Sequence, residues 1–144
     1  MYLSSTDKIE VVLGGAITTV QLQCVASYQD VTSSGLTIPQ ASNQTLTNNT
    51  TEVTLVAAPA ASTNRQVVQM SVFNSDSVSA AVTVKKDVSA TDYTLVTALL
   101  QVGDTLQWSS SLGWSIISQS SQESVIFTSF TASGTWTKPA GLKR

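Results

Sequence analysis

Nine carboxylates are the side chains of this 144-residue chain that remain as candidates for acid–base or metal chemistry. The chain has no histidine, which excludes Ser-His-Asp and Cys-His catalysis as well as imidazole metal ligands. Its single cysteine, Cys24, cannot form an intrachain disulfide or build a zinc or iron–sulfur site, and its place in an alternating apolar run indicates a small core residue. Gly14-Gly15 is an isolated pair that indicates a turn, and the sequence has no glycine-rich phosphate loop.

The carboxylates are spread along the sequence, with no two closer than three positions. Asp87 and Asp92 flank a predicted turn between two strands and could share a calcium ion, although a polar turn is the simpler interpretation. A glycosidase would need two carboxylates across a cleft, and it would usually be a larger protein with more aromatic residues near the site. We therefore expect a chain that is not an enzyme and that has no metal site and no cofactor.

The tryptophans allow two interpretations. Exposed aromatic rings stack on sugar rings in carbohydrate-binding modules, so Trp108 and Trp114 are candidates for ligand stacking. The alternative, which we favour, is that these two residues face each other across one hairpin as core or edge residues. Trp136 has little local core among its neighbours, and we expect it to anchor the C-terminal segment against its own domain or a neighbouring subunit.

The composition indicates a folded chain with an unusual surface. Hydrophobic residues make up 42%, whereas charged residues make up only 11%, against roughly 25% in an average domain. The sequence contains 22 serines and 20 threonines, so its polar surface is rich in hydroxyl groups. Such surfaces are common in proteins that pack into assemblies or are exposed outside a cell.

Charge and hydropathy exclude several kinds of partner. The seven lysines and arginines are spread over the chain, so we expect no nucleic-acid binding, which needs clustered cations. No stretch approaches the 18 consecutive apolar residues of a transmembrane helix, so we expect no membrane partner. Residues 1–8 lack the features of a secretory signal, which predicts cytoplasmic synthesis without a signal peptide.

Apolar residues recur with a period of two, as in strands with one buried and one solvated face. The predicted strands, nine in number, are 9–13, 20–28, 53–57, 68–73, 78–84, 93–100, 106–108, 114–117 and 124–127. The run at 93–100 could form a helical turn, but its β-branched and aromatic residues favour a strand. Short strands at this spacing predict an all-β fold, an antiparallel β-sandwich or a small barrel.

Turn residues divide these strands. We interpret Asn74–Ser77 as a hairpin loop, and 102–104 and 111–113 as turns of a meander of hairpins. Residues 33–51 are rich in Asn, Thr and Ser and contain Pro39, which predicts a long loop with at most one short edge strand. Residues 1–118 are then one domain, and residues 119–144 form an extended C-terminal arm.

Two segments carry a resemblance to known proteins. Residues 54–67, TLVAAPAASTNRQV, precede Asn74-Ser75-Asp76 and Val82-Thr83-Val84. This order resembles a β-rich module of small virion and tail-associated proteins of tailed bacteriophages, in which an AAPA-S-x-x-R link precedes a strand, an N-x-D hairpin and a second strand. Leu100–Leu106 with Gly113-Trp114 is similar to the L-x-x-G-E-x-L…G-W ending of that module, with Asp104 in place of the usual Glu.

The second segment lies in the arm. Residues 130–141, FTASGTWTKPAG, resemble the F-x-x-S-G-T-W-x-x-P-A-G opening of glycine-rich tip domains in phage fibre proteins. Those domains continue into strands and long glycine runs, whereas this sequence ends at Arg144, which argues against a receptor-binding tip in this chain. The arm also contains side chains that are too apolar to be left exposed, in a segment too short to fold alone. We expect five of them to pack on a neighbouring subunit or on the particle shell: Val125, Ile126, Phe127, Phe130 and Trp136.

The resemblance implies a non-enzymatic structural component of a phage particle, either a head or tail fibre or a capsid decoration protein. It places the chain in the virion after synthesis in the host cytoplasm, docked to other virion proteins. Fibre proteins are commonly trimers, so the resemblance also implies a homo-oligomer, with a trimer favoured. The alternative is a phage-tail module that binds a host glycan or receptor through loop 33–51 and the tryptophans.

Overall fold

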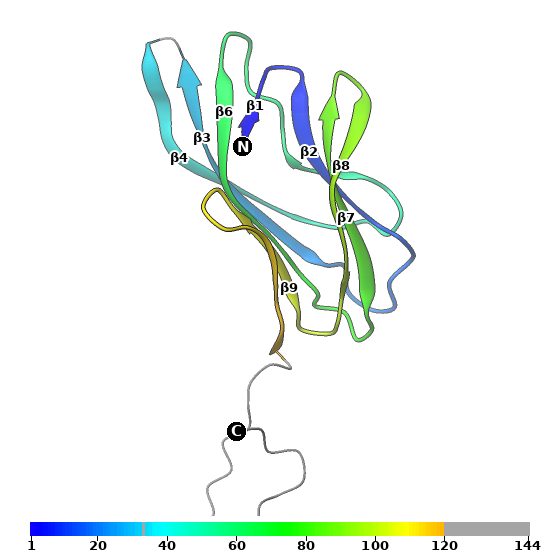
Figure 1. The fold of residues 1–144 in the computed structure, drawn as a ribbon. Helices are drawn as coiled ribbons and strands as arrows, with labels where there is room; N and C mark the ends of the chain where they lie inside the picture. The colour runs from blue at the N-terminus through cyan, green and yellow to red at the C-terminus, as the bar shows by residue number, and fades with distance from the viewer. Residues whose placement is uncertain (33, 120–144) are drawn as a thin grey trace, which may run out of the picture.

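The protein is a sandwich of two antiparallel β-sheets in the computed structural model, which describes residues 1–32 and 34–119 (Figure 1). The larger sheet contains β1 (Tyr2–Leu3), β3 (Gln23–Thr32), β4 (Gly35–Leu46), β6 (Asn64–Phe73), β9 (Thr105–Ser109) and β10 (Gly113–Ile117). The smaller sheet contains β2 (Asp7–Leu13), β5 (Val53–Val56), β7 (Ala80–Val88) and β8 (Thr91–Leu100). Because the strands form two separate sheets, the predicted all-β class is confirmed and the sandwich, not the barrel, is correct.

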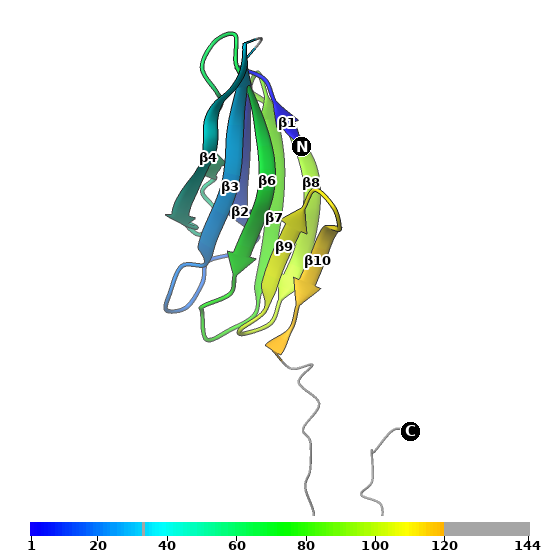
Figure 2. The ribbon, with the colours of Figure 1, turned by 90° about the vertical axis from the view of Figure 1, so that its left-hand side faces the viewer.

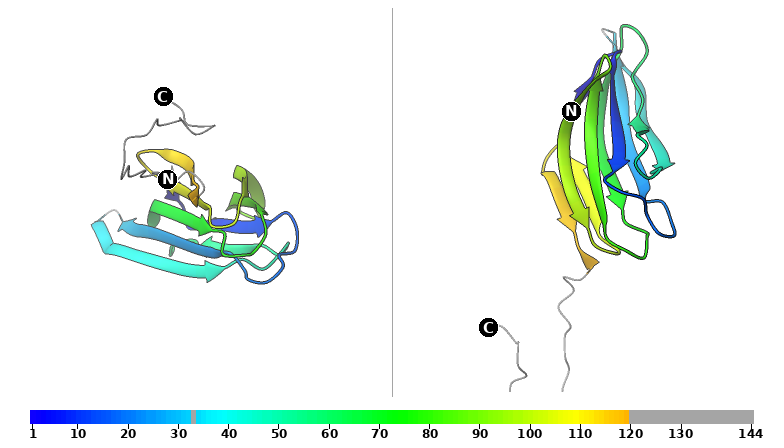
Figure 3. Two further views of the ribbon diagram at one scale, coloured as in Figure 1. Left: turned by 90° about the horizontal axis from the view of Figure 1, so that it is seen from below. Right: turned by 90° about the vertical axis from the view of Figure 1, so that its right-hand side faces the viewer.

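The strand order defines two flanks of the sandwich. The larger sheet runs β10-β9-β6-β3-β4, with β1 also paired to β6, and the smaller sheet runs β5-β2-β7-β8. Strand β5 packs against β3 and β4, and β8 packs against β9. Figure 2 shows the larger sheet with β4 at one edge and β10 at the other, and Figure 3 shows β8 on the same flank as β9 and β10.

The core lies between the sheets and follows the predicted alternation. Every second residue of β2, β3 and β7 points inward, because successive side chains of a strand point to opposite faces. The buried apolar side chains are Leu3, Ile9, Val11, Leu13, Leu22, Cys24, Ala26, Leu55, Val56, Val67, Met70, Val72, Ala80, Val82, Val84, Leu100 and Leu106. The strand predicted at 20–28 begins and ends later than expected, since β3 spans Gln23–Thr32 and Val20 is exposed.

The prediction of a long loop at 33–51 is wrong, because β4 is a strand of 12 residues that pairs with β3. The register places two residues of β4, Pro39 and Gln40, opposite the single residue Gln29 of β3, which is a β-bulge. Proline is tolerated in sheets at edges and bulges, and β4 is both the edge strand and the bulged strand. An edge strand with a polar sequence shows no alternation of apolar residues, so the sequence pattern did not predict β4.

The prediction of a hairpin at Asn74–Ser77 is also wrong. This segment connects β6 of the larger sheet to β7 of the smaller sheet, so it crosses between the layers. The turn at 102–104 likewise connects β8 to β9 across the layers. Of the predicted meander, the β9–β10 hairpin through 110–112 is confirmed, with Trp108 directly opposite Trp114.

The predicted arm begins two residues after β10. Its proposed interface residues, Val125, Ile126, Phe127, Phe130 and Trp136, lie outside the described residues, so their packing stays a prediction. In the described part of the chain no helix is long and apolar enough to cross a membrane.

Candidate docking surface

Charged side chains of the described residues are used to hold the fold together. Each lysine and arginine among them contacts a carboxylate at 4.0 Å or less. The pairs are Lys8 with Glu10 and Asp87, Lys85 with Glu52 and Asp92, Lys86 with Asp7, and Arg65 with Asp30. These four cations are therefore already engaged inside the chain.

Asp87 and Asp92 lie directly opposite each other on β7 and β8, and together with Glu10 they form a group of three carboxylates. Lysines already neutralise this group: Lys8 Nζ lies 3.1 Å from Asp87 Oδ2 and 2.7 Å from Glu10 Oε1. Lys85 Nζ lies 3.1 Å from Asp92 Oδ2, and its hydrogen bond to Glu52 raises the pKa of this lysine. A calcium ion would have to displace two ammonium groups, so the arrangement supports an ion-pair network on the outer face of the smaller sheet.

Asp76 organises the crossing between the sheets. Its carboxylate accepts hydrogen bonds from the backbone N–H groups of Thr18, Thr19 and Val20 at 2.8–3.2 Å and from the Thr19 hydroxyl at 2.6 Å. The hydrogen bond from the Thr19 side chain and those from the backbone hold the pKa of Asp76 well below its ordinary value. The carboxylate therefore fixes the segment before β3 to the loop that follows β6.

Asn74, in the same link between β6 and β7, ties this link to the turn between β8 and β9. Its fully buried side-chain amide donates to the carbonyl oxygens of Val78, Leu100 and Gln101 at 2.9–3.1 Å. Asp104 accepts from the N–H of Gln101 at 2.9 Å and closes the β8–β9 turn. The sequence analysis missed this role, although the signal was present as polar residues between two strands of alternating apolar residues.

Arg65 joins the larger sheet to the end of β5. Its guanidinium donates to both oxygens of Asp30 at 2.7 and 2.8 Å and to the carbonyl oxygen of Ala57 at 2.9 Å. It also lies 4.0 Å from the centre of the Tyr28 ring. The arginine of the AAPA-S-x-x-R segment therefore links two parts of the fold through hydrogen bonds.

Trp108 and Trp114 form the cross-strand pair that the favoured interpretation described. Their ring centres are 6.4 Å apart with an angle of 52° between the planes, and both rings are partly buried against the core. Trp114 lines a surface depression. The use of either ring for stacking on a ligand stays a prediction.

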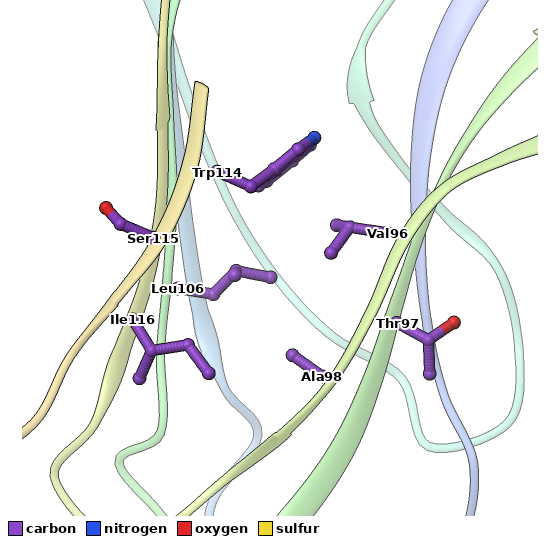
Figure 4. A pocket seen from close by; sticks show the side chains of 7 residues that line it. All are labelled: Val96, Thr97, Ala98, Leu106, Trp114, Ser115 and Ile116. Carbon is purple, nitrogen blue, oxygen red and sulfur yellow. The ribbon is translucent and has the colours of Figure 1, made fainter. Parts of the chain in front are cut away.

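The depression is a groove of about 370 Å³ between β8 and β10, called here the β8–β10 groove (Figure 4). Trp114 and Ile116 of β10 form one wall, Val96 and Ala98 of β8 form the facing wall, and Leu106 lies at the floor. All five side chains are apolar, and Thr97 and Ser115 complete the lining. Sequence analysis did not find this groove, because it depends on which strands end each sheet.

Exposed apolar side chains also occur on the two strands that form the groove walls and in the turn after β8. Ile116 and Ile117 of β10 are 46% and 55% exposed, and Leu99 of β8 is 57% exposed. Val102 is 55% exposed in the turn that joins β8 to β9. Large exposed apolar patches on a monomer mark interaction sites, and the apolar lining of the groove makes it a candidate for one.

No protein-family model, no curated protein and no solved structure matches the chain. The phage resemblance therefore stays an inference from the quoted residues, and the geometry of the groove is the independent observation about function.

Proposed function

We propose that this protein is a non-enzymatic structural component of a bacteriophage particle, a head or tail fibre or a capsid decoration protein, which acts by docking to other protein subunits. The observation that supports it most strongly is the β8–β10 groove with the exposed apolar side chains on its two strands. The groove is lined by apolar and hydroxyl side chains and offers no charged group for catalysis. An apolar surface of this kind suits a protein partner.

Two further features support assembly. The few charged side chains of the described residues are engaged in ion pairs and loop contacts, so the remaining surface is rich in hydroxyl groups. The arm adds an apolar segment that, by its composition, needs a partner surface. A homo-oligomer, with a trimer favoured, and location in the virion are part of this proposal.

Localisation on particles tests it. Particles from infected cells are purified on a density gradient, digested for mass spectrometry and labelled with an antibody to the chain. We expect the chain in the particle fraction at a fixed copy number, with label at one position. Its presence only in the soluble lysate would contradict the proposal.

A second candidate is a phage-tail module that binds a host glycan or receptor. It is favoured by Trp114, whose ring lies on the groove wall where a sugar ring could stack. A glycan array separates the two candidates. Binding that Trp114→Ala abolishes and Trp108→Ala leaves in place would favour the glycan module.

A further inference from the structure

The four edge strands of the sandwich differ in how well they are protected. An exposed edge offers unpaired N–H and C=O groups to another strand, and proteins guard edges with short strands, prolines, bulges and charges. Strand β4 carries Pro39 and a bulge, and β5 and β10 have only 4 and 5 residues. Strand β8 has 10 residues with a bulge at Leu95, and the stretch after it, Val96 to Leu100, contains no bulge, charge or proline. The edge of β8 is therefore the open pairing site.

This open edge borders the groove. Val96 and Ala98 of β8 form one wall, so a strand added beside them would lie across from Trp114 and Ile116. The larger sheet has five strands along its path and the smaller has four, and β10 is the last strand of the larger one. One more strand beside β8 would lie opposite β10 and would cover its half-exposed wall.

The chain contains a segment suited to this place. Residues 124–130, SVIFTSF, are uncharged and combine β-branched with aromatic residues, which are the residues that strands favour. Alternate positions give Val125 and Phe127 on one face and Ile126 and Phe130 on the other. Either face would bring two large apolar side chains to an apolar groove.

The route of the chain favours the groove of a neighbour over its own. Gln119 lies against Gly103, because a Cβ added to Gly103 would be 2.9 Å from Gln119 Oε1. The chain therefore leaves at the β8–β9 turn. Entry into its own groove requires the chain to reverse direction within the four residues that separate Gln119 from the segment 124–130, which takes a tight turn. A path to a neighbour needs no reversal.

Exposed apolar residues outside the groove also favour the groove of a neighbouring copy. Leu99, Val102 and Ile117 are exposed and do not line the groove, so a single inserted strand would leave them exposed. A neighbouring subunit that supplied the strand would also cover these side chains.

Resting on the proposed docking function, we propose that residues 124–130 of a neighbouring copy pair as a strand with the free edge of β8 and insert apolar side chains into the β8–β10 groove. The exchange makes each copy both donor and acceptor. Repeated around a closed ring, it gives a cyclic oligomer without a free groove.

Mixed single-cysteine variants of the full chain test this exchange. One chain carries Ile116→Cys on the groove wall, and the other carries Val125→Cys, Ile126→Cys or Phe127→Cys in the arm. The native Cys24 does not compete, since it is buried at 1% exposure. Because the two new cysteines are on different chains, a disulfide between them forms only between copies.

The matched control replaces Ile116→Cys by Leu46→Cys, since Leu46 is similarly exposed on the edge strand β4. We expect at least one arm variant to form the interchain disulfide about 100-fold faster with Ile116→Cys than with the control, because docking raises the effective concentration from micromolar toward millimolar. Equal rates would overturn the inference. A double variant, Ile116→Cys with the same arm substitution, that is linked only within one chain would also overturn it.

The failure of this inference is distinguishable from failure of the proposed function. Equal disulfide rates in a chain that is oligomeric by light scattering and present in purified particles would reject the groove as the acceptor and leave the docking function standing. Absence of the chain from particles would contradict the function whatever the disulfide rates.

Discussion

The two flanks of the sandwich are built differently. On the flank of β4 and β5, called here the closed flank, the side-chain amide of Asn43 donates to the Leu55 carbonyl oxygen at 2.8 Å, and Arg65 reaches the Ala57 carbonyl oxygen. The flank of β8 and β10, called here the open flank, has no such hydrogen bonds between these two strands among the described residues; it has an apolar groove between the sheets and half-exposed side chains such as Ile116. The depression of about 330 Å³ on β3 and β4 differs in that its lining includes the polar side chains of Gln23, Gln44 and Thr45. Polar contacts therefore join the sheets on the closed flank, and the open flank is the surface that we propose for assembly.

Acid should cause the largest loss of stability against unfolding, because it protonates the aspartates of the polar contacts. The hydrogen bond from Arg65 lowers the pKa of Asp30. Burial opposes ionisation of Asp7, but the Ser4 amide and Lys86 outweigh it and lower the pKa of Asp7 to about 2. Because these pKa values are lower in the folded chain, the unfolded chain takes up protons first, and the stability present above about pH 4 is lost as the pH falls.

Urea unfolding at a series of pH values measures this loss. We expect the midpoint to fall most steeply between about pH 4 and pH 2, the interval between the ordinary aspartate pKa and that of Asp7. A midpoint that does not change over this interval would contradict the assigned role of these carboxylates.

Arg65→Met should destabilise the fold by removing contacts of the closed flank. The substitution removes the guanidinium from the buried Asp30 carboxylate and from the Ala57 carbonyl oxygen. We expect a loss of about 3 kcal/mol in the free energy of unfolding, as for other buried ion pairs that lose one partner. Urea unfolding of the variant measures it, with Arg65→Lys as the control that keeps the charge and should lose less. A loss as large for Arg65→Lys would show that planar, two-pronged hydrogen bonding carries the effect.

Ile116→Lys should weaken association through the open flank. A charge in the apolar groove opposes burial of that wall, so we expect association to weaken about tenfold, or about 1.4 kcal/mol. Stability should change by less than about 0.5 kcal/mol, because the side chain is already half exposed. Sedimentation and urea unfolding measure the two quantities. Leu46→Lys on β4 is the matched control, and an equal effect on association there would show that the open flank is not special.

Asn43→Ala should have the smallest effect. It removes one partly buried hydrogen bond between the layers, from Asn43 to the Leu55 carbonyl oxygen, and we expect a cost of about 1 kcal/mol in unfolding free energy. The control Asn48→Ala changes an exposed side chain and should be neutral within about 0.5 kcal/mol. Equal losses for the two variants would remove Asn43 from the account of the closed flank.

The sequence predicted the strands that have one buried face, because alternation records burial directly. Residues of β2, β7 and β8 were identified in this way, and so was the Trp108–Trp114 pair. Strand β4 was missed because an edge strand with polar residues buries little. The assignment of β6 and β7 to different sheets was also missed, since a polar link such as Asn74–Ser77 has the same composition in a hairpin and in a crossing between layers.

The candidate site was less predictable than the fold. The walls of the β8–β10 groove come from residues 96–116, but their opposition depends on the strand order of both sheets. Apolar residues such as Ile116 and Leu99 follow the same alternation as core residues, so a sequence pattern cannot show that they remain exposed. The apolar residues of the arm indicated from sequence alone that the arm needs a partner surface. The groove proposed as its acceptor could be identified only from the structure.

Amide hydrogen exchange of the full chain tests the central claim most directly, namely that the molecule is closed at β4–β5 and receives its partner at β8–β10. Exchange is measured at protein concentrations above and below the association equilibrium. We predict that amides of β8 become more protected as the concentration rises, while those of β4 keep the same rates. Protection gained along β4, or unchanged exchange along β8 in an associated sample, would contradict it.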